Sequence, residues 1–172
     1  MFRYPRFYRY ATLLGLEELE LIVGQSLVQV YLHIVFSTKL RKPLLCDLAK
    51  RERMHAYLAG VCSNQNSPSV IIGGVEDHVH LLCRLGKTID IATLMPELKK
   101  ESSEWAKSDL CIPNFYWQGG YGAFSISPNH VDPLIAYIKN QEEHHRQESF
   151  QDEFRRLCNK YDVEIDERYV WE

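Results

Sequence analysis

The sequence lacks any Cys-x-x-Cys pair, and its five cysteines are scattered over 172 residues. This odd and dispersed set argues against a disulfide framework or a zinc ribbon and favours reduced thiols in a cytoplasmic protein. No run reaches the roughly 18 to 20 apolar residues of a membrane span. Positive charge is not in excess either, because the formal net charge is −3. This balance argues against bulk electrostatic attraction to nucleic acid, so any nucleic-acid contact must come from local basic patches.

The chain length suits one compact domain, but its beginning differs from the rest. Residues 1–25 combine arginines and aromatics with one short apolar segment that Glu17 and Glu18 interrupt, which makes a signal peptide a poor interpretation. We expect an N-terminal extension over residues 1–25, either loosely attached or translated from upstream of the true start. One folded domain is expected over residues 26–172.

Hydrophobic periodicity predicts the order of the secondary-structure elements. Apolar residues alternate along residues 27–38, which indicates a strand, and two further apolar strands joined at Glu76-Asp77 predict a hairpin. Helical patterns cover residues 47–64, about 90–107, 128–147 and 150–161, with Asp47 and either Thr88 or Asp90 as N-caps. The order strand–helix–strand–strand–helix–strand–helix predicts an α+β, ferredoxin-like sandwich. Its antiparallel sheet would carry helices on one face, with an additional C-terminal helix.

Two histidines on the second strand of the hairpin are the first candidates for chemistry. Side chains alternate between the faces of a strand, so His78 and His80 should stand on one face and Val79 on the other. Imidazole is the commonest metal ligand, and two imidazoles on one rigid strand form half of a metal site. The alternative is a pair of hydrogen-bonded histidines near a strand end.

Tyr137 and Gln141 are four residues apart in a predicted helix, so they should share a face. Together with His78 and His80, the amide oxygen of Gln141 would complete a site for a divalent cation. An amide in place of a third imidazole favours Mg²⁺ or Mn²⁺ over Zn²⁺. Tyr137 would then attack phosphorus and form a covalent phosphotyrosine.

Four segments in this order make the chain resemble a known family. It resembles the single-tyrosine transposases of the insertion-sequence-200/605-like group, within the His-hydrophobic-His endonuclease superfamily, with REP-associated tyrosine transposases as close relatives. The resemblance covers about residues 26–169. Its markers are His33-Ile34-Val35-Phe36-Ser37-Thr38-Lys39, Glu76-Asp77-His78-Val79-His80-Leu81-Leu82, Trp117-Gln118 with Gly120-Tyr121-Gly122-Ala123-Phe124-Ser125, and Tyr137-Ile138-Lys139-Asn140-Gln141 with His144-His145.

The resemblance implies a DNA transposase that cuts and rejoins single-stranded DNA at hairpin-marked element ends. Carried over by position, Tyr137 is the nucleophile that forms a 5′-phosphotyrosine, and His78, His80 and Gln141 are ligands of Mg²⁺ or Mn²⁺. The resemblance also implies a homodimer whose sheets join, in which the tyrosine helix of one subunit can complete the site of the other. It leaves the choice between an autonomous mobile element and a REP-associated role open.

The remaining polar residues receive weaker interpretations. His33 is expected to be packed or hydrogen-bonded in the core. A solvated or dimer-contact role is expected for His144 and His145, with contact to a substrate phosphate as the alternative. The alternative function is a domesticated REP-associated or non-catalytic module that binds hairpin nucleic acid. A metal-free histidine phosphoesterase is disfavoured because no His-x-Ser or His-x-Thr motif occurs. Candidate DNA contacts are Lys39, Arg41, Lys42, Arg84, Lys99 and Lys100.

Overall fold

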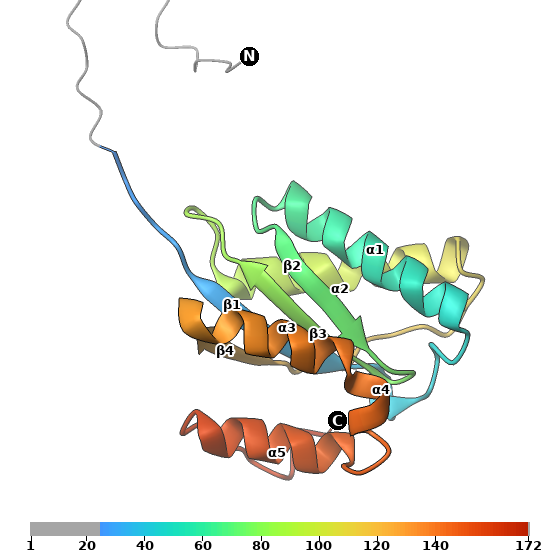
Figure 1. Cartoon of the computed structure of the whole chain (residues 1–172). Helices are drawn as coiled ribbons and strands as arrows, with labels where there is room; N and C mark the ends of the chain where they lie inside the picture. The colour runs from blue at the N-terminus through green and yellow to red at the C-terminus, as the bar shows by residue number, and fades with distance from the viewer. Residues whose placement is uncertain (1–24, 172) are drawn as a thin grey trace, which may run out of the picture.

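The computed structural model of the chain describes residues 25–171. The extension predicted over residues 1–25 therefore lies, except for Gln25, outside the described residues. The elements follow one another as β1 (Tyr31–Ser37), η3 (Lys39–Arg41), α1 (Leu48–Asn64), β2 (Ser69–Gly74), β3 (His78–Arg84), α2 (Ile91–Ser108), β4 (Gly122–Ile126), η4 (Pro128–His130), α3 (Val131–Lys139), α4 (Gln141–His144) and α5 (Phe150–Lys160) (Figure 1).

The four strands form one antiparallel sheet with the order β2-β3-β1-β4. The predicted hairpin is present as β2 and β3, and β1 lies between β3 and β4. In the register of β1 with β3, Ser37 pairs with His78 and Val35 pairs with His80. The predicted α+β sandwich is thereby confirmed, and the two histidines lie in the interior of the sheet on the second of its four strands.

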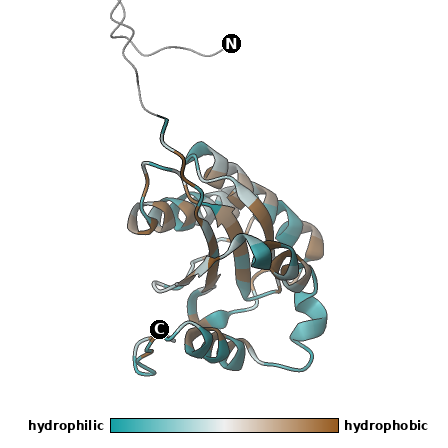
Figure 2. Cartoon of the chain, turned by 60° about the vertical axis from the view of Figure 1, so that its left-hand side comes forward, coloured by the Kyte–Doolittle hydropathy of each residue, from teal (hydrophilic) through white to brown (hydrophobic). Residues whose placement is uncertain are grey.

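Helices cover both faces of the sheet. The larger core lies between one face and the helices α1 and α2, where Ile34, Phe36 and Leu81 are fully buried. On the opposite face α3 packs over Leu82 and α5 packs over Val35. Figure 2 shows hydrophobic residues concentrated along the strands and on the helix sides that face them. Val79 and Leu81 of β3 point into the core beneath α1 and α2. Because side chains alternate along a strand, His78 and His80 point to the opposite face, which α3 and α5 cover.

The helix N-caps at Asp47 and Asp90 are as predicted, since each carboxylate accepts a hydrogen bond from the backbone N–H three residues on. The continuous helix predicted over residues 128–147 is wrong. It divides into η4, α3 and α4, with a break at Asn140, whose backbone angles are φ −102° and ψ 19°. Asparagine favours such breaks because its short polar side chain competes with helical backbone hydrogen bonds. Tyr137 and Gln141 consequently lie on separate helices.

All five cysteines lie in the described part of the chain, and each is a free thiol. This agrees with the reduced state expected from their spacing. Within residues 25–171, no helix combines the length and apolar character needed to cross a membrane.

Candidate active site

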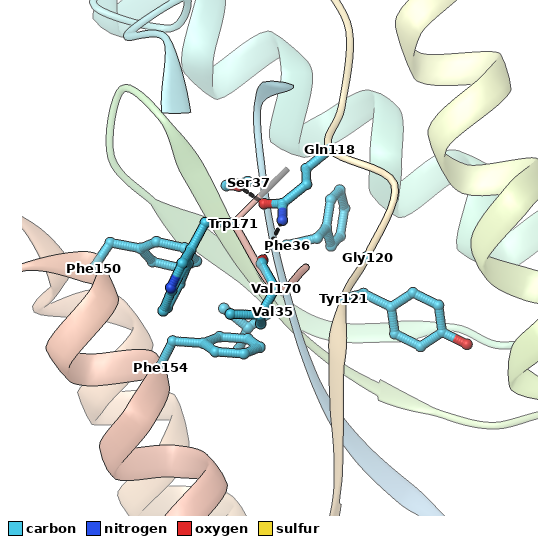
Figure 3. A pocket seen from close by; sticks show the side chains of 10 residues that line it. All are labelled: Val35, Phe36, Ser37, Gln118, Gly120, Tyr121, Phe150, Phe154, Val170 and Trp171. Carbon is cyan, nitrogen blue, oxygen red and sulfur yellow. Dashed lines mark hydrogen bonds between the residues drawn. The ribbon is translucent and has the colours of Figure 1, made fainter. Parts of the chain in front are cut away.

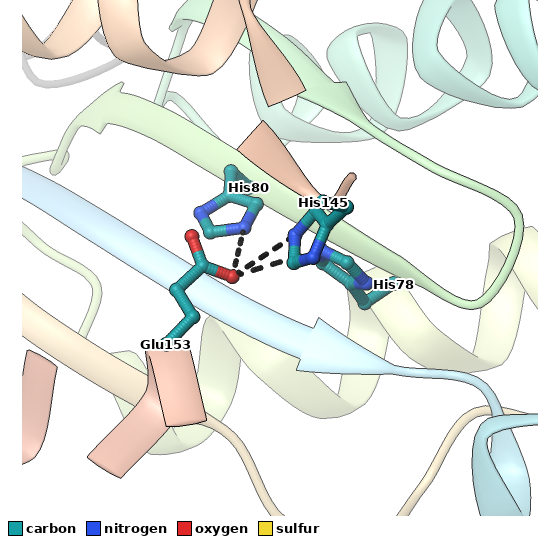
Figure 4. Close-up of side chains that lie close together, drawn as sticks. All are labelled: His78, His80, His145 and Glu153. Carbon is teal, nitrogen blue, oxygen red and sulfur yellow. Dashed lines mark ion pairs between the residues drawn. The ribbon is translucent and has the colours of Figure 1, made fainter. Parts of the chain in front are cut away.

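Three imidazoles and one carboxylate meet on the sheet face that α3 and α5 cover. One ligating atom from each of His78, His80, His145 and Glu153 lies within 4.8 Å of the others (Figure 4). His78, His80 and Glu153 are fully buried, and the His145 side chain is 12% exposed. A cluster of this composition, enclosed by the protein, has the donor types of a metal centre.

Three different elements bring these four side chains together. His78 and His80 come from β3, where the two-residue period of a strand aims them at the same face. His145 directly follows α4, and Glu153 lies in the first turn of α5. The side chain of Ser149 caps α5 by accepting a hydrogen bond from the N–H of Asp152, which fixes where the helix begins.

His80 is oriented by His33 on the neighbouring strand. Nε2 of His33 lies 2.9 Å from Nδ1 of His80, and both rings are buried. Burial lowers the pKa of His80 to about 4 and that of His33 to about 3, so both rings are neutral at pH 7. When His80 donates from Nδ1, its Nε2 carries a lone pair directed at Glu153. The core role predicted for His33 is confirmed, and its partner is a member of the cluster.

The other two imidazoles are oriented in the same way. Nδ1 of His78 lies 2.6 Å from a carboxylate oxygen of Asp77, and Nδ1 of His145 lies 3.0 Å from the carbonyl oxygen of Glu148. Both partners can only accept, so each Nδ1 donates and Nε2 is the ring nitrogen left for a ligand. Metal-binding histidines are held by this kind of second hydrogen bond.

The ligating atoms of the cluster are buried without hydrogen-bond partners among the described residues. Buried polar atoms of proteins are nearly always paired, so several orphans in one place indicate a missing ligand. Together they offer three nitrogen and two oxygen donors, a set that fits a divalent cation. They are Nε2 of His78, His80 and His145, Oε2 of Glu153 and Oε1 of Gln141.

Gln141 lies at the edge of this cluster and is 1% exposed. Its amide nitrogen is 3.4 Å from Oε1 of Glu153. The sequence predicts that Gln141 joins the two strand histidines. In the structure Gln141 lies on the same side of the sheet as these histidines, in spite of the helix break at Asn140.

Tyr137 stands next to the cluster in the same chain. Its hydroxyl donates a hydrogen bond to Oε1 of Glu153, and its ring centroid is 5.9 Å from that of His80. Nε2 of His144 lies 3.4 Å from the same hydroxyl, and the guanidinium of Arg156 lies 3.1 Å from it. The phenol, the carboxylate and the imidazoles are thus contiguous within one chain.

The pKa values of the two partners of this hydrogen bond are shifted in opposite directions. Burial, together with the negative charge of Glu153, raises the pKa of Tyr137 above its usual range. Burial alone would also raise the pKa of Glu153, but the neighbouring imidazoles of His145 and His80 and the hydroxyl of Tyr137 outweigh it and hold the carboxyl pKa well below normal. At neutral pH the pair is therefore a protonated phenol and an ionised carboxylate.

Sequence reasoning overlooked Glu153 and assigned His145 to solvent or a dimer contact. In the structure, the Nε2 atom of His145 is 3.2 Å from Oε2 of Glu153, so the solvated role is wrong. A signal for Glu153 was present in the sequence. Position 153 lies on the apolar side of α5, three residues from Phe150 and four from Leu157, where a carboxylate is out of place unless it has a partner.

The C-terminal segment fastens α5 to the sheet. Gln118 accepts a hydrogen bond from Ser37 and donates one to the carbonyl of Val170. Figure 3 shows Trp171 beside Phe150 and Phe154 of α5 at a small pocket. These contacts hold the first turns of α5, and with them the Glu153 carboxylate, against β1.

A second pocket, of about 190 Å³, opens beside Tyr137 and reaches His33. Two cations from α5, Arg156 and Lys160, lie on its wall together with Tyr161. Arg156 is also paired with Glu148 through three hydrogen bonds of 2.8, 3.0 and 3.3 Å. The pocket therefore gives an outside molecule access to the phenol past basic and aromatic side chains.

The six candidate DNA contacts do not form one surface. Lys39, Arg41 and Lys42 follow the end of β1, whereas Arg84 is at the opposite end of the sheet, because it pairs with the first residue of β1. Lys100 is exposed on α2, but the ammonium of Lys99 donates to three backbone carbonyls, those of Gln118, Gly119 and Gly120. The six basic residues are thus divided between the two ends of the sheet and helix α2.

One solved structure shares this fold. A crystal structure of a protein from Deinococcus radiodurans R1, described as a candidate transposase, superposes with a TM-score of 0.53 at 22% identity, over 69% of this chain and 95% of the other. A REP-associated tyrosine transposase bound to a REP hairpin gives a TM-score of 0.49 at 12% identity, over 72% of each chain. Among curated proteins, none matches the chain.

The family comparison covers the sheet and the tyrosine helix. The model described as "Transposase IS200 like" matches residues 26–141, which include β1 to β4, both strand histidines, Tyr137 and Gln141. The match stops short of His145 and Glu153. Because it spans well over half of the chain, the protein belongs to the IS200-like transposase family, enzymes that act on DNA.

Proposed function

We propose that this transposase cuts and rejoins single-stranded DNA through a covalent bond between Tyr137 and a 5′-phosphate. The observation that carries the proposal is the hydrogen bond from the Tyr137 hydroxyl to Glu153, whose other oxygen faces three imidazoles. A phenol next to a buried cluster of potential metal ligands is the arrangement required for nucleophilic attack on a phosphodiester.

The chemical step is a transesterification that begins at the phenol oxygen. Tyr137 is protonated at neutral pH, so a base must take its proton as the oxygen attacks phosphorus. Glu153 already accepts a hydrogen bond from this hydroxyl, which places its carboxylate where it can take that proton. A bond forms between the tyrosine oxygen and phosphorus, and the bond between phosphorus and the 3′-oxygen breaks. The 3′-oxygen leaves as a hydroxyl after taking a proton from solvent, and reversal of these events reseals a strand.

A divalent cation, Mg²⁺ or Mn²⁺ as expected from the sequence, would be held by His78, His80 and the amide oxygen of Gln141. When bound, such an ion polarises the phosphodiester and stabilises charge on the departing oxygen. The fit is supported by three buried atoms without hydrogen-bond partners among the described residues, Nε2 of His78, Nε2 of His80 and Oε1 of Gln141.

The DNA strand is proposed to approach through the pocket beside Tyr137. Arg156 and Lys160 would contact the backbone phosphates there, and Tyr161 offers an aromatic face for stacking with a base. A single strand is favoured because the formal net charge is −3 and the six candidate basic contacts do not form one surface that could bind duplex DNA. Recognition of hairpins near the element ends, and a homodimer, are carried over from the family resemblance. The catalytic set lies in one chain, which favours attack within a subunit over attack across a dimer.

The experiment compares Tyr137→Phe with Tyr169→Phe, whose ring is exposed. The substrate is a single-stranded oligonucleotide that carries a hairpin taken from the DNA flanking the gene. The wild-type protein and Tyr169→Phe should each form a covalent protein–DNA adduct with Mn²⁺, and Tyr137→Phe should form none while still binding the oligonucleotide. Cleavage by Tyr137→Phe would show that another residue is the nucleophile.

The alternative function, a non-catalytic hairpin-binding module, makes the opposite prediction for the wild-type protein. It would bind the hairpin oligonucleotide without forming an adduct under any metal condition. Burial of an ionised carboxylate against a phenol and three imidazoles has no use in such a module, and costs stability without a ligand. This consideration favours the enzyme.

A further inference from the structure

We infer that His145 and Glu153 belong to the metal site itself, and that the enlarged site prefers a transition-metal dication to Mg²⁺. The inference rests on the proposed function and refines it. The two strand histidines and Gln141 lie within the family match, whereas His145 and Glu153 come from the segment beyond residue 141. The additional ligands would therefore be supplied by the C-terminal part of this chain.

The positions of the donor atoms support His145 as a third imidazole ligand. Its ring centroid is 4.4 Å from that of His78, and its Nε2 is one of the four atoms that lie within 4.8 Å of one another. Its Nδ1 is occupied by the carbonyl of Glu148, so Nε2 is the nitrogen left to bind an ion. The orientation matches those of His78 and His80.

The two carboxylate oxygens of Glu153 make different contacts. Oε1 receives the hydrogen bonds from Tyr137 and Gln141. Oε2 has no hydrogen-bond partner in the described part of the chain and lies 3.2 Å from His145 Nε2, 3.4 Å from His80 Nε2 and 3.9 Å from His78 Nε2. A carboxylate surrounded by three imidazole nitrogens occupies the place of an anionic ligand. Glu153 would thus connect the ion to the nucleophile through one side chain.

This donor set changes the expected choice of ion. With two imidazoles and an amide, the site suits Mg²⁺ or Mn²⁺. A third imidazole and a carboxylate make it nitrogen-rich, and imidazole suits first-row transition metals whereas Mg²⁺ prefers an all-oxygen shell with several waters. Affinity should therefore rise in the order Mg²⁺, Mn²⁺, Co²⁺, Zn²⁺, as it does for most nitrogen and oxygen sites.

The first test measures binding by the metal-stripped, full-length protein without DNA. Mg²⁺, Mn²⁺ and Zn²⁺ are titrated separately by calorimetry, and Co²⁺ is followed by its visible absorption. The inference predicts one site per chain, with the affinity order given above and Mg²⁺ as the weakest ion. Equal or tighter binding of Mg²⁺, or no binding of any of these ions, would overturn it. This result does not depend on any variant folding correctly.

The second test compares variants that separate the two new ligands. His145→Asn and the isosteric Glu153→Gln should each weaken Mn²⁺ binding by at least about 10- to 100-fold, the loss that even outer-shell substitutions cause. The matched controls are His130→Asn and Glu164→Gln, both at exposed positions, and these should bind Mn²⁺ like the wild-type protein. Unchanged Mn²⁺ affinity in His145→Asn or in Glu153→Gln would remove that residue from the site and overturn the inference.

DNA cleavage then distinguishes failure of this inference from failure of the proposed function. Excess Mn²⁺ should restore adduct formation in His145→Asn, which has lost a ligand only. It should not restore it in Glu153→Gln, which has also lost the acceptor for the Tyr137 proton. Tyr137→Phe should bind Mn²⁺ normally and form no adduct. If Tyr137→Phe still cleaves, the nucleophile is wrong while the metal inference stands. If Tyr137→Phe forms no adduct but His145→Asn and Glu153→Gln both bind Mn²⁺ normally, the metal inference is wrong while the proposed nucleophile stands.

Discussion

Nε2 of His33 and Nδ1 of His80 lie 2.9 Å apart across the neighbouring strands β1 and β3. His33 does not belong to the four-residue cluster, yet it determines which nitrogen of His80 faces that cluster. Two neutral buried imidazoles can share one proton only if one donates and the other accepts. His33 is therefore a positioning residue for the metal site.

Replacement of His33 by leucine should weaken Mn²⁺ binding by about 10- to 100-fold, because His80 loses the partner that fixes its tautomer. It should also lower the free energy of unfolding by about 1 to 3 kcal/mol, since Nδ1 of His80 becomes an unsatisfied buried group. His33→Gln offers a replacement acceptor and should recover part of the affinity. Calorimetric titration and urea unfolding measure the two effects, and a leucine variant with wild-type Mn²⁺ affinity would contradict the positioning role.

The parts of the fold that depend on short-range periodicity could be predicted from the sequence. Alternation of apolar residues in β1 and the Glu76-Asp77 turn defined the strands, and the same period put His78 and His80 on one face. The N-caps at Asp47 and Asp90 followed from local side-chain chemistry. Each of these features is determined by residues close together in the chain.

The contribution of the C-terminal part to the site could not be predicted in this way. Glu153 reaches the histidines only because α5 docks against the sheet, and that docking depends on contacts such as the hydrogen bond between Gln118 and Val170, 52 residues apart. Periodicity predicts that α5 exists, but it does not state which face of the sheet the helix covers. The break at Asn140 was missed for the related reason that a weak local preference competes there with tertiary packing.

Arg156→Gln should reduce adduct formation by roughly 10²-fold, the usual loss when one donor to a developing negative charge is removed. Its guanidinium lies 3.1 Å from the Tyr137 oxygen and faces the pocket proposed for DNA. Mn²⁺ binding should be unchanged because Arg156 is not a member of the cluster. Arg146→Gln is the control, since that side chain is 75% exposed and pairs only with Glu143 among the described residues. Similar cleavage by the two variants would argue against a role for Arg156.

Two adjacent lysines of α2 should separate a structural role from a DNA-binding role. Lys99→Met should lower the free energy of unfolding by about 1 to 3 kcal/mol, because the carbonyls of residues 118–120 lose their donors. Lys100 is exposed, so Lys100→Met should change stability by no more than about 0.5 kcal/mol. If Lys100 contacts DNA, its loss should weaken oligonucleotide binding and reduce the salt dependence of that binding. Urea unfolding and binding titrations at several salt concentrations measure these effects, and equal stability of the two variants would refute the structural role of Lys99.

Gly73 of β2 allows α3 to approach the sheet closely enough to position Tyr137. A Cβ atom at residue 73 would lie 2.6 Å from the carbonyl oxygen of Ile138, the residue after the tyrosine. Gly73→Ala should therefore push α3 outward, cost about 1 to 3 kcal/mol of stability, and reduce adduct formation by up to about 10²-fold through displacement of the phenol. Gly60→Ala in α1 is the matched control, because a Cβ there meets nothing within 4 Å and alanine should stabilise the helix by about 0.5 to 1 kcal/mol. Thermal unfolding should therefore show a loss of stability in Gly73→Ala and a gain in Gly60→Ala. The adduct assay should show reduced activity in Gly73→Ala only. Normal cleavage by Gly73→Ala would mean that the close approach of α3 does not set the position of the nucleophile.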